Sequence, residues 1–161
     1  RVTFNESQGS AQQISSVDLS TRQVTPIPDS KGLYSPRMSP DGRFIVAVNT
    51  PENRLLRLFD TQTQKWSTLF DSKTGGPGWP QWSADSRYVY GTFMLTPKLQ
   101  HYGLVRIGVP DGKLEQVADF NVPEGTLGNW GPWVGVTPDN SPLALRDRSS
   151  QDIYAIDVDW P

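Results

Sequence analysis

Three copies of one short phrase constrain the fold of this chain more than any other feature of its sequence. Residues 39–45 read SPDGRFI, residues 83–89 read SADSRYV, and residues 137–143 read TPDNSPL. The copies begin about 44 and about 54 residues apart, and self-similarity at roughly this spacing indicates a repeat architecture. We therefore expect a row of similar small structures, with the function on the surface that the row creates.

Short β-rich runs bounded by turn residues occupy the repeats, and no sustained helical pattern of apolar residues interrupts them. Each repeat is interpreted as four strands, of which the first is short and ends at the phrase. Trp82 on an inner strand and Trp66 on an outer strand are expected to pack against neighbouring structure. The expected strands cover residues 2–4, 13–18, 23–27, 36–39, 44–48, 55–59, 65–69, 80–83, 88–93, 103–107, 113–117, 143–146 and 152–157.

A tight hairpin turn is predicted at each copy of the phrase. Pro40 presets φ for a turn, and Gly42 can adopt the positive φ that a three-residue hairpin loop needs. In the other copies, Asn140 is a tolerable substitute for that glycine and Ser86 is a weaker one. The aspartate of each copy is expected to accept backbone N–H bonds inside its turn, with a repeated metal ligand as the alternative. These aspartates are Asp41, Asp85 and Asp139.

The strand count leads to one fold class, an all-β β-propeller segment. The first interval is typical of propeller blades, and the runs group as three strands, then four, four and three. We expect about four four-stranded blades in an incomplete ring: residues 1–30 in part, 31–72, 76–120, and 130–161 in part. An open stack leaves strand edges and an apolar sheet face uncovered, so we expect upstream blades, or self-association through the open blade edges, to cover them. A compact sandwich of repeated hairpins is the alternative.

The net charge and composition of the sequence exclude several classes of partner. A formal net charge of −2 over 161 residues gives no long-range attraction, so we expect no contact with nucleic acid. No apolar run approaches the roughly 18 residues needed to span a membrane, so we expect no membrane insertion. Cysteine is absent, which removes disulfides and thiol catalysis. The chain begins at Arg1 without a methionine, so we expect it to be a piece of a longer protein.

Two stretches carry a resemblance to a known repeat. Residues 80–85, PQWSAD, and residues 153–157, IYAID, resemble the TolB-like β-propeller repeat, and the likeness covers nearly all of the chain. The segments 131–139 and 142–147, taken with 153–157, resemble the C-terminal end of acidobacterial regulators that carry an N-terminal winged-helix or Ser/Thr-kinase domain. That resemblance implies a sensor or scaffold whose output domain lies elsewhere. The middle repeat departs from the pattern at Ser86, and its third strand lacks a terminal aspartate.

The sequence offers no recognised set of catalytic residues. The Gly-x-Ser-x-Gly elbow of a serine hydrolase is absent, and His101 is the single histidine available to a catalytic triad. Zinc sites need clustered His and Cys, and glycosidases need two facing carboxylates, neither of which the sequence places together. The Gly-rich segment 74–78 lacks the lysine of a phosphate-binding loop. We therefore expect that the chain is not an enzyme and that it holds no metal or cofactor.

Four residues remain as candidates for binding a ligand or partner. Trp79 and Trp130 flank long Gly- and Pro-rich connections between blades, which lie on one rim of the channel in a propeller. Tryptophan is a frequent interface anchor, although covering the core at the blade ends is the alternative role for both. Arg37 enters an inner strand, from which its guanidinium is expected to point into the channel. His101 is expected at a loop or strand end.

The function expected from these observations is binding. We expect a non-catalytic β-propeller sensor or docking module in the C-terminal part of a larger bacterial regulatory protein. Its partner would be a protein or a small molecule on the channel rim. Two alternatives stay open, a TolB-like periplasmic interaction scaffold and the propeller domain of a prolyl-oligopeptidase-like peptidase. The sequence leaves the compartment open between the periplasm and the cytoplasm.

Overall fold

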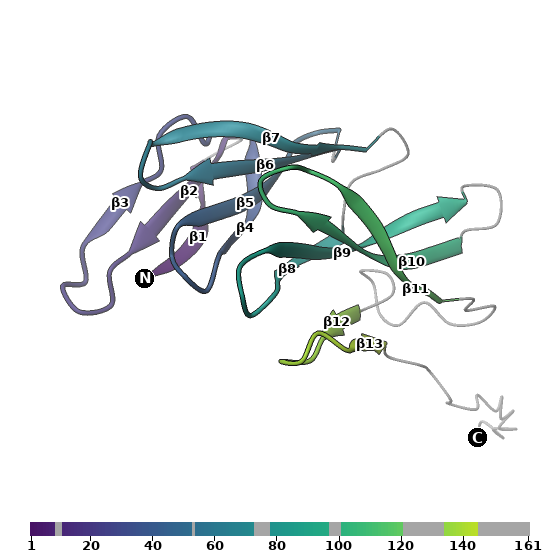
Figure 1. The fold of residues 1–161 in the computed structure, drawn as a ribbon. Helices are drawn as coiled ribbons and strands as arrows, with labels where there is room; N and C mark the ends of the chain where they lie inside the picture. Colours follow the sequence, from purple (N-terminus) through teal and green to yellow (C-terminus); the bar gives the residue numbers. More distant parts are fainter. Residues whose placement is uncertain (9–10, 53, 73–77, 97–100, 121–133, 145–161) are drawn as a thin grey trace, which may run out of the picture.

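The described strands form four antiparallel β-sheets that follow one another along the chain (Figure 1). The computed structural model describes residues 1–8, 11–52, 54–72, 78–96, 101–120 and 134–144. Strands and their connections make up all of these residues, and no helix occurs among them, so the predicted all-β class is confirmed. Within the same ranges, no helix is long and apolar enough to cross a membrane.

Each sheet is a meander in which strands that follow one another in sequence are neighbours. The first sheet contains β1 (Val2–Gln8), β2 (Ala11–Val17) and β3 (Val24–Pro26). The second sheet contains β4 (Leu33–Met38), β5 (Phe44–Asn49), β6 (Leu55–Asp60) and β7 (Lys65–Asp71). The third sheet contains β8 (Gly78–Trp82), β9 (Tyr88–Thr96), β10 (His101–Gly108) and β11 (Leu114–Phe120). The described part of the fourth sheet contains β12 (Val134–Val136) and β13 (Pro142–Ala144).

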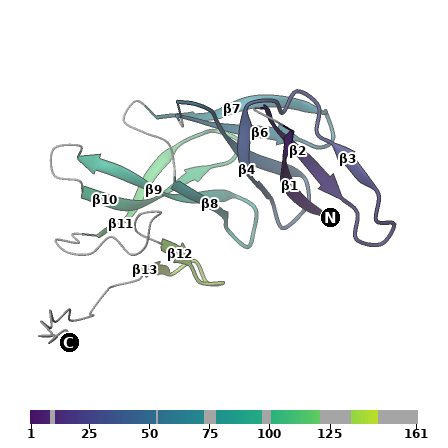
Figure 2. The same cartoon turned by 180° about the vertical axis from the view of Figure 1, so that it is seen from behind.

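The strands lie close to the expected ranges, although β1 is several residues longer than expected and β12 had no range of its own among the expected strands. β4 begins at Leu33, before the expected start at residue 36, and β9 continues to Thr96, beyond the expected end at residue 93. The strand expected at residues 152–157 lies outside the described residues. The sheets form an arc that does not close, with the first sheet at one end and β12 and β13 at the other (Figures 1 and 2).

The second sheet is buried on both of its faces, which explains why its central strands are apolar at consecutive positions. Along β5, Ile45 and Ala47 face the first sheet, whereas Val46 and Val48 face the third sheet. These four side chains are between 0% and 2% exposed. Side chains of a strand alternate between its two faces, so a strand between two other sheets needs apolar residues on both.

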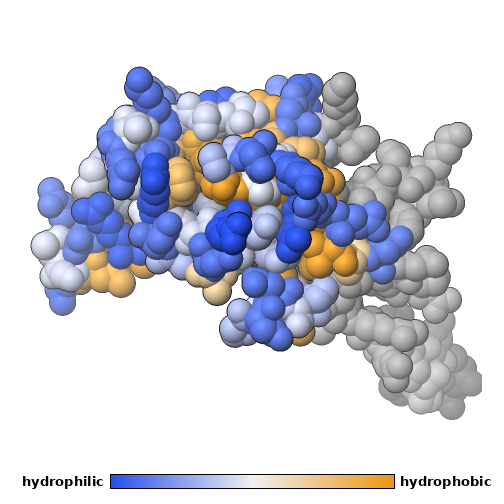
Figure 3. All heavy atoms as spheres, viewed as in Figure 1, coloured by the Kyte–Doolittle hydropathy of each residue, from blue (hydrophilic) through white to orange (hydrophobic). Residues whose placement is uncertain are grey.

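Two hydrophobic clusters therefore hold the first three sheets together. The cluster between the first and second sheets contains Ile14, Ile27, Leu33, Ile45, Ala47 and Phe59. The cluster between the second and third sheets contains Val46, Val48, Leu56, Leu58, Leu69, Val89, Val105 and Ile107. The surface drawn in Figure 3 is mainly hydrophilic over the described residues, and hydrophobic atoms come to the surface in a few places, mostly in the middle of the view.

Two tryptophans link neighbouring sheets through polar contacts as well as apolar ones. Trp66 on β7 packs its ring 5.0 Å from that of Phe59, and its Nε1 donates to the Pro28 carbonyl of the preceding connection at 2.8 Å. Trp82 on β8 donates from Nε1 to the Arg37 carbonyl of the second sheet at 2.9 Å. Both tryptophans pack against neighbouring structure, as expected from the sequence. The N–H groups of these half-buried indoles thus both have a backbone acceptor on a neighbouring element.

An asparagine on the first sheet fixes the inner strand of the second sheet. Asn5 on β1 donates from Nδ2 to the Leu33 carbonyl at 3.1 Å, and its Oδ1 accepts the N–H of Ser35 at 3.0 Å. The β4–β5 register shifts between Tyr34 and Arg37, and Ser35 has a φ of 54°. A bulge frees backbone groups from the ladder, and the Asn5 amide satisfies two of them.

The central position of the cluster between the first two sheets gives a direct stability test. Phe59 is 0% exposed, and the Phe59→Ala substitution should lower the free energy of unfolding by about 3–5 kcal/mol because it leaves a cavity. Urea denaturation followed by tryptophan fluorescence measures the change. Leu114→Ala is the control, since Leu114 is 39% exposed and should change the free energy by less than about 1 kcal/mol. Equal effects of the two substitutions would contradict this account of the core.

Candidate functional site

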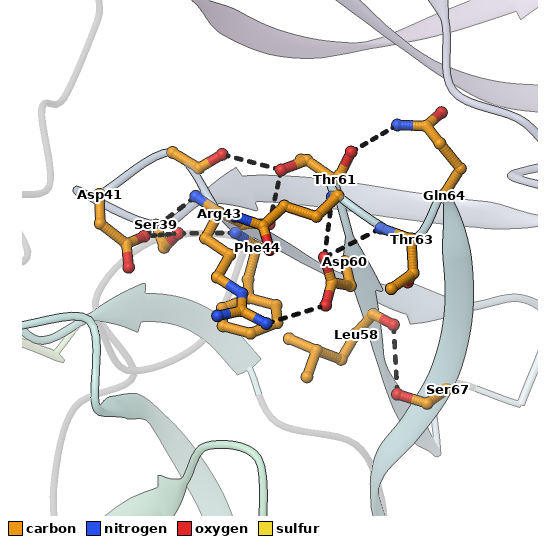
Figure 4. Close-up of polar contacts among 12 residues, drawn as sticks. Ser39, Asp41, Arg43, Phe44, Leu58, Asp60, Thr61, Thr63, Gln64 and Ser67 are labelled. Atoms are coloured by element: carbon orange, nitrogen blue, oxygen red, sulfur yellow. Dashed lines mark hydrogen bonds and ion pairs between the residues drawn. The ribbon is translucent and has the colours of Figure 1, made fainter.

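Each copy of the repeated phrase folds into a hydrogen-bonded turn that closes one end of its sheet, and Figure 4 shows the copy between β4 and β5. Between β4 and β5, the Ser39 hydroxyl donates to Asp41 Oδ1 at 2.5 Å and accepts the N–H of Phe44 at 2.9 Å. Asp41 Oδ1 also accepts the N–H of Arg43 at 3.0 Å. The Ser39 hydroxyl, and then the Arg43 N–H, hold the pKa of Asp41 below its ordinary value.

The other two copies repeat these contacts. The Ser83 hydroxyl donates to Asp85 Oδ1 at 2.6 Å and accepts the N–H of Tyr88 at 3.0 Å. The Thr137 hydroxyl donates to Asp139 Oδ1. These hydroxyl groups are the main reason that the pKa values of Asp85 and Asp139 are also lowered. The prediction that the recurring aspartates fix their turns is therefore confirmed.

The residue that follows the aspartate in each turn has a left-handed backbone. The φ angles are 72° at Gly42, 60° at Ser86 and 65° at Asn140, at the three positions where the sequence predicted a positive φ. A serine is strained in this region because its β-carbon crowds the backbone. The Ser86 hydroxyl offsets that strain by accepting the N–H of Asp41 in the neighbouring turn at 3.2 Å. Ser86 thus ties the turn of the second sheet to that of the third.

A second kind of turn joins the third and fourth strands of a sheet, at the same end as the first kind. Asp60 Oδ1 accepts the N–H of Gln62 at 2.8 Å, and this bond is the main reason that the pKa of Asp60 is lowered. Asp18 Oδ1 accepts the N–H groups of Ser20 at 2.9 Å and Thr21 at 3.1 Å. The bond from Thr21 contributes most to lowering the pKa of Asp18. Both carboxylates therefore serve the local backbone.

The third sheet has Gly108 in place of this aspartate, and its turn explains the departure from the repeat. Asp111, within the turn itself, accepts the N–H of Lys113 at 3.1 Å. A β-carbon at residue 108 would collide with Asp111 Oδ1. In this turn the carboxylate is supplied by Asp111, and with its side chain in this position the space beside residue 108 suits a glycine.

The two kinds of turn are joined within the second sheet (Figure 4). The Arg43 guanidinium lies 5.0 Å from the centre of the Phe44 ring, and its Nη2 is 3.4 Å from Asp60 Oδ2. The Thr61 hydroxyl donates to the Arg43 carbonyl at 2.8 Å. Gln64 donates from Nε2 to the Thr61 carbonyl at 2.8 Å. This network holds Thr61 and Gln64 in fixed positions at the end of the sheet.

A crevice of about 350 Å³ lies between the first and second sheets, beside these turns. Ser16 on β2 and Thr25, which is opposite it on β3, line one wall. Ile45 on β5 and Phe59 on β6 line the other wall, and Ile27 contributes to the floor. The short side chains of Ser16 and Thr25 thus lie opposite the larger Ile45 and Phe59. They do not fill the space between the two sheets, whereas protein interiors are normally close-packed.

The rim of the crevice is mostly neutral and polar. Gln23, Thr25 and Gln64 bring amide and hydroxyl groups to it. Asp18 is the one carboxylate among the described residues that line the crevice, and Arg1 Nε lies 3.6 Å from its Oδ2. Asp18 is charged at neutral pH, and the nearby arginine balances this charge. The crevice therefore offers apolar contact at its floor and hydrogen bonds at its edge.

Arg37 is not among the described residues that line this crevice. Arg37 lies on β4 with an exposed side chain, and its Nη1 donates to the adjacent Pro36 carbonyl at 2.9 Å. Trp79 lies within β8, and His101 is the first residue of β10, both in the third sheet. Trp130 lies outside the described residues. A binding role for these four residues stays a prediction.

Reasoning from the sequence missed the crevice, because the crevice arises where one repeat differs from the next and not from a shared motif. The Ser16–Thr25 pair on β2 and β3 occupies the place that the Leu58–Ser67 pair has on β6 and β7. A signal was available in the sequence, since Ser16 precedes Asp18 by the same interval that separates Leu58 from Asp60. Across the described residues, no group of three or more His, Cys, Asp or Glu side chains is placed to hold a metal ion.

Comparison with known proteins identifies the fold. No protein-family model matches the chain, and no curated protein matches it by sequence. Among solved structures, TolB from Acinetobacter baumannii matches with a TM-score of 0.61 and 19% identity, over 86% of this chain and 38% of that chain. A putative TolB from Agrobacterium tumefaciens gives 0.62 and 20%, over 88% and 53%. A prolyl endopeptidase structure gives 0.63 and 16%, over 84% and 23%.

These similarities show a TolB-like β-propeller fold, as predicted, in a chain that spans about half or less of each of these proteins. The prediction that the chain is not an enzyme was wrong. Similar folds include the prolyl endopeptidase and an oligogalacturonate lyase from Vibrio parahaemolyticus, which are enzymes. The sequence argument failed because it searched for a few motifs, whereas one fold hosts many kinds of site.

The turn aspartates predict how stability depends on pH. The pKa of each is lower in the folded chain than the ordinary value of 3.8, so each stabilises the fold above about pH 4. This contribution should be lost as the pH falls through the folded-state pKa values. Urea midpoints measured from pH 6 to pH 2.5 should therefore fall, and the Asp41→Asn/Asp85→Asn variant should show a shallower fall.

Asp29→Asn is the matched control for this experiment, because Asp29 is an exposed aspartate outside these turns. It removes one carboxylate without touching the repeated hydrogen bonds. Its pH profile should follow that of the unmodified chain. A double variant that retains the full pH dependence would contradict the role assigned to the two aspartates.

Proposed function

We propose that this chain is a binding segment of a TolB-like β-propeller, and that the crevice between its first two sheets is part of the binding surface. The crevice carries the proposal because it is a hollow on a rigid frame, lined by an apolar floor and a polar rim. Its volume of about 350 Å³ falls within the range of small-ligand pockets, roughly 300–1,000 Å³. The turns beside it are fixed by side-chain hydrogen bonds.

The chemistry of the crevice favours a ligand with one apolar group and neutral polar edges. Met38, which is half-buried, and Ile27, which is 8% exposed, provide the apolar contact, and the amides of Gln23 and Gln64 can donate and accept hydrogen bonds. An apolar side chain on the peptide of a partner protein combines these properties. The proposed role is therefore that of an interaction scaffold, in which the crevice receives one side chain of the partner.

Two further parts of the proposal come from the sequence. The exposed Arg37 on an inner strand supports a second contact with the partner at the channel rim. The resemblance of residues 131–157 to the ends of bacterial regulators supports a place in a larger regulatory protein, where another domain provides the output.

Binding to the crevice can be tested with N-acetyl-phenylalaninamide, which has an apolar ring and two neutral amides. We expect the backbone amide signals of Gln23 and Thr25 to shift in NMR spectra as this probe is added. Thr25→Trp should abolish the shifts of the remaining signals around the crevice, because the indole fills the space beside Phe59. Thermal unfolding should confirm that the variant remains folded.

Thr68→Trp is the matched control, since Thr68 is an exposed threonine on β7, the corresponding outer strand of the second sheet. Its titration should resemble that of the unmodified chain. Shifts that persist in the Thr25→Trp variant, or that are absent from the unmodified chain, would refute binding in the crevice.

A further inference from the structure

The rim of the crevice between the first and second sheets carries a carboxylate whose position is fixed by the backbone. Asp18 Oδ1 accepts the N–H groups of Ser20 at 2.9 Å and Thr21 at 3.1 Å, so the side chain is held in one orientation. Asp18 comes two residues after Ser16 at the end of β2, and alternate side chains of a strand point to the same face. Both residues line the crevice, and the carboxylate lies roughly 7 Å beyond Ser16 along the chain.

The second oxygen of this carboxylate is open to a ligand. Among the described residues, the one cation paired with Asp18 Oδ2 is Arg1, whose Nε lies 3.6 Å away, too far for a good hydrogen bond. The Arg1 side chain is 65% exposed and the Asp18 side chain is 34% exposed. An exposed pair with this geometry is weak, so a cation held in the crevice can take the place of the arginine.

The corresponding carboxylate of the second sheet is committed to its own sheet. Asp60 Oδ1 accepts the N–H of Gln62, and Asp60 Oδ2 accepts a hydrogen bond from Arg43 Nη2 at 3.4 Å (Figure 4). The Asp60 side chain is 20% exposed, and it is not among the described residues that line the crevice. The same kind of turn therefore keeps its carboxylate for the fold in one repeat and presents it to a crevice in the other.

The crevice places this negative charge close to apolar surface. Arg1 and Asp18 are the charged residues among the described residues that line it, and the other polar groups are neutral hydroxyls and amides. The half-buried Met38 and the more deeply buried Ile27 provide the apolar surface. All of these groups surround a volume of about 350 Å³. A ligand with an apolar group and an adjacent cation matches both features of the crevice.

We propose that the ligand of the crevice carries a cationic group beside its apolar group, and that Asp18 Oδ2 binds this cation. The inference rests on the proposed function and adds the charge of the ligand at one edge of the crevice. In a peptide of the partner protein, a lysine or arginine next to the apolar residue supplies the cation. Asp18 then determines specificity, because a charge-assisted hydrogen bond to a carboxylate is stronger than a neutral one.

Two probes of matched size and shape test the proposal. The first is 2-phenylethylamine, which is cationic at neutral pH, and the second is 2-phenylethanol, which is neutral. NMR titrations that follow the backbone amide signals of Gln23 and Thr25 give a dissociation constant for each probe. We expect the amine to bind about threefold more tightly at low salt, which is the effect of a partly exposed charge pair. Addition of about 0.5 M NaCl should remove most of this difference by screening.

Asp18→Asn removes the charge, whereas its amide oxygen can still accept the backbone N–H bonds of the turn. The two probes should bind this variant equally, and thermal unfolding should show that it remains folded. Arg1→Gln removes the competing guanidinium and should increase the preference for the amine. Asp111→Asn is the matched control, because Asp111 holds the corresponding turn of the third sheet and is not among the described residues that line the crevice. It should keep the preference of the unmodified chain.

The outcomes separate this inference from the proposed function. If neither probe shifts the Gln23 and Thr25 signals, the crevice does not bind apolar ligands and both proposals fail. If both probes bind the unmodified chain equally, or if the preference persists in the Asp18→Asn variant, the crevice still binds but the role of Asp18 is overturned. A preference that Asp111→Asn abolishes as well would also overturn it, since net charge alone would then explain the effect.

Discussion

The second sheet is held between two neighbours, and the other features of the structure depend on that double burial. Ile45 and Phe59 contact the first sheet, and Val46 and Val48 contact the third. A sheet with two apolar faces is not stable by itself, so each repeat depends on the next for its core. The crevice between the first and second sheets and the hydrogen bond between the turns of Asp41 and Ser86 both depend on how closely one sheet packs on the next.

Local features of the structure could be predicted from the sequence, because each is determined within a single repeat. The hydroxyl–carboxylate turn at Ser39 and Asp41 needs residues that are near neighbours in the chain, and so does the positive φ at Ser86. The crevice depends instead on Ser16 facing Phe59 across two sheets. That pairing follows from the stacking of one repeat on another, which no single segment of sequence encodes.

The polar groups that recur between repeats form hydrogen bonds within the fold, and the candidate site lies where the repeats differ. Asp18 and Asp60 accept backbone N–H bonds in their own turns. Ser16, by contrast, is short at a place where the second sheet has Leu58. In a repeat protein, shared residues report on architecture, whereas a departure from the repeat marks a place where one interface between sheets is unlike the next.

The hydrogen bond from the Asp41 N–H to the Ser86 hydroxyl fixes the distance between the turns of the second and third sheets. Apolar packing between these sheets is non-directional and does not by itself fix that distance. The hydrogen bond connects two loops directly, so neither can tilt or slide without disturbing the other. Glycine at position 86 would suit the local backbone better but would release this tie. Serine at position 86 has a strained backbone, but its hydroxyl links the two adjacent loops. A molecule that contacts both loops therefore meets a surface whose geometry is already fixed.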